Sequence, residues 1–179
     1  MSATLDEAVE QLSELVERLD SGALQGITSG ILEEGYTFGD FSDLSDEELE
    51  AAYASAFNLI DQGKATDAEK LFRLLLTLDH HDHRFWMGLG VSLQLQKKFR
   101  LANATYAHLY TLDYENCVPP LRSAECLMNL GEYQYAEGAA IAAEAAAERQ
   151  PDRFKTELAS ARMILAEIER LRAGALSPS

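Results

Sequence analysis

A period of 34 residues is the feature that most constrains how this chain can fold. Three alanines stand 34 residues apart, and each is preceded by a turn residue five positions earlier. The alanines are Ala68, Ala102 and Ala136, and the turn residues are Gly63, Lys97 and Gly131. A period of this length is typical of helical hairpins that stack, because one hairpin cannot bury its apolar face alone. The period therefore predicts an all-α solenoid.

The middle copy indicates which hairpin repeats. It carries Trp86, Leu89 and Gly90 in its first half and Ala102 and Tyr106 in its second half. Small residues fit where the two helices of one hairpin touch, and this order is typical of the tetratricopeptide repeat. We therefore expect three tandem tetratricopeptide hairpins in a curved α-solenoid with a concave surface, an N-terminal helical extension and a C-terminal capping helix.

Capping and breaking residues predict the element boundaries. Ser45 with Glu48 forms a capping box at the start of the first repeat, and Pro120 suits the first turn of a later helix. The expected helices are 46–62, 66–78, 83–96, 100–112, a fifth ending near 130, 134–149 and a closing helix from Pro151. The expected domains are an N-terminal extension over 1–44, the repeats with their cap over 45–173, and a flexible tail over 174–179.

Acidic charge is concentrated at the start of the chain. The net charge is −15, and residues 1–61 hold 15 acidic residues and a single base, Arg18. This distribution argues against nucleic acid and anionic membranes as partners. It leaves two interpretations open, a solubilising surface or a field that attracts a basic partner. The acidic N-terminus does not read as a secretory signal, so we expect a cytoplasmic protein.

An apolar seam near the N-terminus predicts self-association. Its members are spaced four and three residues apart, as in a coiled coil, but they span barely two heptads. A helix this short is marginal alone, so it must pack on its own repeats or on another protomer. We interpret it as the candidate interface of a homodimer, formed by Leu5, Val9, Leu12, Val16 and Leu19.

The concave face is expected to be apolar. In a tetratricopeptide hairpin the second, fifth, ninth and twelfth residues of each repeat face inward, and eight of these twelve residues are apolar or aromatic. A solvated surface of this size is rarely so apolar. Two interpretations remain open, packing against the N-terminal segment or a groove for an extended apolar peptide. The candidate groove residues are Tyr53, Phe57, Ile60, Arg84, Met87, Val91, Leu121 and Met128.

Catalytic and metal-binding motifs are weak. His80, His81 and His83 lie beside Asp82 in an inter-repeat turn, but no further cysteine or histidine pair completes a four-ligand site. A capping role for Asp79 or Asp82 explains the turn better. Gly88-Leu-Gly90 lies within an expected helix and suits packing rather than phosphate binding. We expect no metal, no cofactor and no enzymatic activity.

Several blocks are more specific than a generic repeat. The blocks are Leu49 to Asn58, Gly63-Lys64, Leu78-Asp-His-His-Asp82, Arg84-Phe-Trp-Met-Gly-Leu-Gly90 and Ser123-Ala-Glu-Cys-Leu127. They resemble the class II chaperones of bacterial type III secretion, the SycD/LcrH-type translocator chaperones, over roughly residues 31–171.

This resemblance implies a function. Members of that family are cytosolic, ATP-independent chaperones that keep hydrophobic pore-forming translocators soluble and competent for secretion. A translocator segment with a proline-x-leucine-x-x-proline type motif lies extended in their groove, and they tend to dimerise. By position, the resemblance assigns groove roles to Tyr53, Phe57, Arg84, Met87 and Leu121. The alternatives are a generic interaction scaffold and a regulatory partner that titrates another protein.

Overall fold

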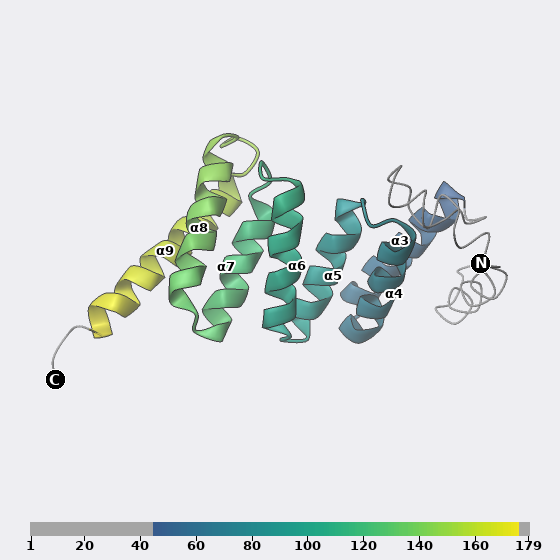
Figure 1. The fold of residues 1–179 in the computed structure, drawn as a ribbon, viewed down its shortest axis with the longest axis horizontal. Helices are drawn as coiled ribbons and strands as arrows, with labels where there is room; N and C mark the ends of the chain where they lie inside the picture. The colour runs from purple at the N-terminus through teal and green to yellow at the C-terminus, as the bar shows by residue number, and fades with distance from the viewer. Residues whose placement is uncertain (1–44, 176–179) are drawn as a thin grey trace, which may run out of the picture. The chain divides into compact units, whose positions relative to one another are not determined.

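The computed structural model describes residues 45–175 and places seven α-helices there, joined by short turns, with no strand in that range. Figure 1 draws these helices as coiled ribbons, coloured by residue number. The all-α prediction is confirmed. The helices are α3 (Asp46–Asp61), α4 (Ala65–Leu78), α5 (His83–Leu95), α6 (Phe99–Leu112), α7 (Val118–Leu130), α8 (Tyr133–Glu148) and α9 (Lys155–Ala175).

The chain divides into two compact units, residues 1–89 and 90–179, with the boundary inside α5. The described part of the first unit holds α3, α4 and the start of α5. The second holds the rest of α5 with α6 to α9. None of the described helices is long and apolar enough to cross a membrane.

The predicted turn residues share one backbone conformation. Gly63, Lys97 and Gly131 have φ angles of 74°, 59° and 73°, so all three are left-handed. Glycine adopts this conformation without steric cost, whereas a lysine is strained there. The predicted capping box is also confirmed, because Ser45 and Glu48 bond reciprocally at the start of α3.

A glycine sets the packing of the first unit. A Cβ atom on Gly88 would stand 2.2 Å from the ring carbons of Phe72, which is fully buried. Only glycine therefore lets α5 lie directly on this ring of α4. The expectation that Gly88-Leu-Gly90 serves packing is confirmed at this residue.

The second unit repeats the device. A Cβ atom on Gly90 would stand 2.4 Å from the ring of Tyr106, which is also fully buried. In this unit α7 packs against both α6 and α8, and α9 packs against α8 (Figure 1). The core of α8 is made of small side chains, Ala136, Ala140, Ala143, Ala146 and Ala147.

One predicted helix boundary needs correction. The closing helix begins at Lys155 and not at Pro151, because residues 151–154 form turns and bends that bury Phe154 against Cys117, Ala146 and Ala147. The helix α7 begins at Val118, so Pro120 lies inside its first turn as predicted, where a missing N–H leaves no helical bond unmade.

Candidate functional site

Tyr53 is the centre of an aromatic cluster in the first unit. Its ring lies 6.2 Å from the ring of Phe57 on the next turn of α3, and 6.2 Å from Phe72 of α4. The ring of Phe85 on α5 lies 5.8 Å away. Phe72 and Phe85 are fully buried, so they anchor the cluster in the core. Tyr53 therefore joins the core to the surface.

Phe57 is the exposed member of this cluster. Its side chain is 49% exposed, although it is one of the largest apolar residues of the unit. Ile60 on α3 and Met87 on α5 are half-buried. We call Tyr53, Phe57, Ile60, Arg84 and Met87 the aromatic face. An apolar ligand that covers this face would bury carbon surface, and each Å² buried would stabilise the complex by about 25 cal/mol.

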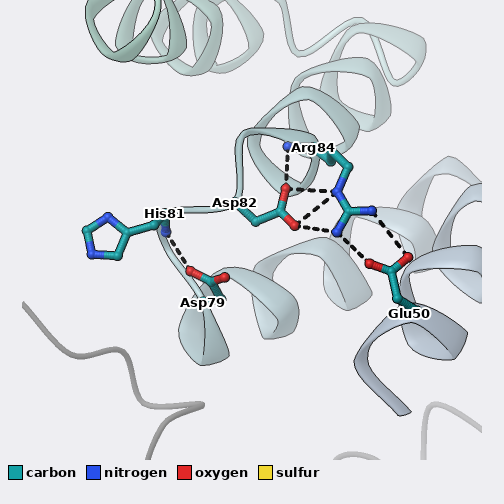
Figure 2. A network of polar contacts seen from close by, with 5 residues as sticks. All are labelled: Glu50, Asp79, His81, Asp82 and Arg84. Atoms are coloured by element: carbon teal, nitrogen blue, oxygen red, sulfur yellow. Dashed lines mark hydrogen bonds and ion pairs between the residues drawn. The ribbon is translucent and has the colours of Figure 1, made fainter. Parts of the chain in front are cut away.

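Arg84 is held in place by two carboxylates (Figure 2). Its Nη2 atom lies 2.6 Å from Oε1 of Glu50 and 2.6 Å from Oδ2 of Asp82. Its Nε atom also donates to Asp82, and its Nη1 atom donates to Glu50 at 3.2 Å. The guanidinium carbon stands 4.9 Å from the centre of the Tyr53 ring, within cation–π range. The head group therefore has little freedom of orientation.

Asp82 supports this arrangement in two ways. Its Oδ1 atom accepts the backbone N–H of Arg84 at 2.8 Å, which caps the start of α5 as predicted. Partial burial raises the pKa of Asp82, but the hydrogen bonds and charge of Arg84 outweigh this effect and leave the pKa below its ordinary value. The same bonds, with those of Glu50, raise the pKa of Arg84. Asp79 accepts the backbone N–H of His81 in the preceding turn (Figure 2).

The ion pair between Arg84 and Glu50 was not predicted from the sequence, although the positions of the two residues in the repeats could have indicated it. The two residues are 34 positions apart, so each is the second residue of its repeat. Equivalent positions on consecutive repeats are neighbours in a stacked solenoid. Opposite charges at these positions were therefore sufficient to predict the ion pair.

The remaining predicted groove residues belong to the second unit, where they differ in accessibility. Val91 is half-buried. Met128 is half-buried and packs against Leu127, Ala136 and Ile168. Leu121 is only 5% exposed and packs with Ala143 and Ala161, because α9 covers this part of α7. The structure therefore places Leu121 in the core and not on an accessible groove.

A polar chain occupies the neighbouring inward positions of this unit. Tyr106 donates its hydroxyl to Gln94 at 2.9 Å, and Gln94 donates to Glu125 at 3.0 Å. Glu125 also accepts from Arg122 at 3.0 Å. This part of the second unit is thus polar and internally bonded, whereas the aromatic face of the first unit is apolar except for Arg84.

Two further sequence predictions concern the N-terminal seam and the histidine cluster. The seam of Leu5, Val9, Leu12, Val16 and Leu19 lies outside the described residues. Among residues 45–174, no group of three or more His, Cys, Asp or Glu side chains is arranged to hold a metal ion. His80 and His81 instead lie ring against ring, 4.0 Å between centroids.

Comparisons with known proteins agree on one kind of molecule. The tetratricopeptide repeat family matches residues 50–82 and 83–116. Low calcium response locus protein H of Yersinia pseudotuberculosis is 33% identical over 136 residues, which is 76% of this chain and 81% of that protein.

Solved structures extend the comparison. A type III secretion complex from Aeromonas hydrophila matches with a TM-score of 0.77 and 32% identity, over 83% of this chain and 98% of that chain. The Yersinia enterocolitica translocator chaperone SycD, bound to a peptide of the translocator YopD, matches with a TM-score of 0.68 and 33% identity, over 73% and 99%. An alternative dimer of SycD matches equally well, over 73% and 98%.

Proposed function

Because this chain belongs to the translocator chaperones of type III secretion, the family of Low calcium response locus protein H and SycD, we propose that it binds a translocator of its own secretion system and keeps it soluble before export. This activity takes place in the bacterial cytoplasm. It requires no cofactor and no catalytic step, because the chaperone acts by covering apolar surface of the translocator.

The observation that carries this proposal is the aromatic face. A half-exposed phenylalanine beside a tyrosine and a methionine is a poor solvated surface but a good seat for aliphatic and proline side chains. SycD holds a translocator peptide, and we propose that the equivalent segment of this chain's cargo lies extended across Tyr53, Phe57 and Met87.

The fixed guanidinium supports an apolar cargo. Arg84 carries one positive charge, and its two partners, Glu50 and Asp82, carry two negative charges. An acidic segment would therefore meet a local excess of negative charge and would gain little from Arg84. A ligand that buries carbon atoms against the rings fits this balance better than one selected by acidic groups.

Self-association is part of the proposal. SycD forms a dimer, and we propose that this chain also acts as a homodimer. The N-terminal seam predicted from the sequence is one candidate interface, and it stays a prediction.

Co-expression tests the function. The translocator of the same secretion system, produced alone, should be insoluble or toxic, and production with this chain should make it soluble and bound. Limited proteolysis of the complex should then leave one protected translocator segment, whose sequence identifies the cargo peptide. The chain with Phe57→Ala should protect this segment less well, and Tyr114→Ala, an exposed aromatic outside the face, is the matched control.

Two results would contradict the proposal. A translocator that stays equally insoluble with and without this chain would exclude a chaperone of that cargo. A translocator that is soluble by itself and merely binds would indicate a scaffold.

A further inference from the structure

The helix α9 lies over the inward side of α7, within the second unit. By repeat position, Val118, Leu121 and Met128 are the apolar inward residues of the third repeat. Each of them belongs to an apolar cluster to which α9 contributes a side chain. The helix α9 therefore covers this inward surface as a bound ligand would. Its contributions are Leu158 beside Val118, Ala161 beside Leu121 and Ile168 beside Met128.

The contacts of α9 form one stripe. Leu158, Ala161, Ile164 and Ile168 are spaced three or four residues apart, so they lie on one side of the helix. Ile164 packs against two of the three clusters. An apolar stripe laid into a groove is a common way in which proteins recognise an amphipathic helix. Here α7 and the small alanines of α8 form the floor of the groove.

Acidic side chains of α8 form one edge of this groove. The helix α8 has three acidic residues, Glu137, Glu144 and Glu148, and all three bond to arginines of α9. Arg162 lies 2.7 Å from both Glu144 and Glu148. Arg172 lies 2.7 Å from Glu137. A ligand in the place of α9 must therefore combine an apolar stripe with a basic edge, since any other helix leaves these carboxylates without partners.

The attachment of α9 is shallow. Of residues 155–174, only Ala161 and Ile168 are buried, whereas α7 buries seven of its 13 residues. Arg162 and Arg172 are 55% and 51% exposed, and ion pairs in contact with water contribute little to stability. Segments with few buried contacts open locally before the rest of a fold does. Among the described helices of the second unit, α9 is thus the one that leaves at the lowest cost.

We propose that α7 and α8 form a second cargo site, a helix-binding groove that α9 closes in the free chain. Its ligand is an amphipathic segment of the translocator with a basic edge, which displaces α9 and uses the same clusters and carboxylates. This inference rests on the proposed function, because the ligand belongs to the same translocator. It adds a helical segment to the extended one at the aromatic face.

Tethering explains why α9 yields only to the translocator. A helix joined to its own groove competes at a high effective concentration, so a free peptide of similar chemistry displaces it poorly. A translocator already held at the aromatic face raises the effective concentration of its second segment in the same way. Before cargo arrives, α9 keeps the apolar floor of the groove out of water.

Hydrogen exchange of the co-expressed complex tests the displacement. We expect amides of residues 158–172 to exchange at least tenfold faster in the complex than in the free chain. Amides of α7 around Leu121 should keep their protection, because the translocator segment replaces α9 there. Binding that leaves α9 in place predicts the opposite for α9, namely unchanged or slower exchange.

A double variant and a peptide probe test the groove in the free chain. Arg162→Ala with Arg172→Ala removes the bonds between α9 and α8. A fluorescent peptide of residues 153–175 should then bind the full-length variant at least fivefold more tightly than it binds the wild type. Arg170→Ala is the matched control, because Arg170 bonds to Glu167 within α9, and it should behave as the wild type does.

The outcomes separate this inference from the proposed function. Failure to form any complex would contradict the proposed function, whereas the peptide would still test the groove. A complex in which α9 keeps its protection would overturn the displacement and leave the chaperone function intact. A peptide that binds the double variant no better than the wild type would overturn the helix-binding groove.

Discussion

The guanidinium carbon of Arg84 lies 4.9 Å from the centre of the Tyr53 ring, and two carboxylates fix it there. Tyr53 in turn contacts two fully buried rings, Phe72 and Phe85. The ion pairs and the aromatic core therefore form one continuous structure, with Phe57 at its exposed edge. A cargo segment that touches Phe57 meets a surface whose shape is set before binding, which lowers the entropic cost of association.

Arg84 should act as a positioning residue for this surface. Arg84→Lys keeps the charge but loses the fork that bonds to Glu50 and Asp82 at once. We expect about a tenfold loss of cargo affinity or less, with a small change in stability, because the ion pairs are partly exposed. Calorimetric titration with the protected cargo segment measures it. The contrary result is that wild type and Arg84→Lys bind the cargo segment equally well and lose affinity equally as salt is added. That result would show that Arg84 acts through its charge and not by positioning the surface.

Gly90→Ala should destabilise the chain. The new Cβ atom would stand 2.4 Å from the Tyr106 ring, so helix or ring must shift. Overpacking of this kind costs roughly 1–3 kcal/mol, more than the helix propensity gained. Urea unfolding measures the loss. Gly174→Ala is the matched control, since nothing lies within 4 Å of that position, and equal stability of the two variants would contradict the packing described.

Lys97→Gly should stabilise the chain. Lys97 has a φ of 59°, where a side chain is strained. Relief of that strain exceeds the added entropy of the unfolded glycine, so we expect a net gain of roughly 0.5–1 kcal/mol. The opposite kind of change, Gly131→Ala, places a side chain on a left-handed residue with a φ of 73°. It should lower the stability of the chain by a similar amount. Thermal unfolding of both variants checks the pair, and a shift of the same sign in both would count against it.

The cap at Asp82 should make the free energy of unfolding depend on pH in the acidic range. Its pKa is lowered in the folded chain, so its contribution is present above the unfolded pKa and is lost as pH falls through the folded value. Asp82→Asn keeps a capping oxygen but loses the charge, and we expect it to cost about 1–2 kcal/mol near neutral pH. That difference should shrink below about pH 4. Unfolding curves across this range test it, and a constant difference would refute the linkage.

The sequence was sufficient for the fold because each repeat encodes its own turn and its own small contact residue. Gly63, Lys97 and Gly131 have the conformation that the period indicated, and Gly90 packs as its position predicts. Leu121 is a different case. Repeat position alone places it on a concave face, but the packing of α9 depends on a segment without a full repeat, and it buries this residue.

The candidate site was predictable in part for the same reason. Tyr53 and Phe57 follow from repeat position, whereas the contacts of Tyr53 with Phe72 and Phe85 require the three-dimensional arrangement. These contacts change the choice of probe. Tyr53→Ala would remove core packing as well as any cargo contact, so a loss of binding by that variant has two causes. Phe57, which is half-exposed, separates them.

The affinity of Phe57→Ala for the protected translocator segment is the most direct test of the chaperone site. Calorimetric titration should show a loss of roughly 1–3 kcal/mol, as for a moderate hot spot, with an unfolding midpoint close to that of the wild type. Tyr114→Ala, with a side chain 63% exposed outside the aromatic face, should bind as the wild type does. Equal affinity of Phe57→Ala and the wild type would contradict cargo binding at the aromatic face.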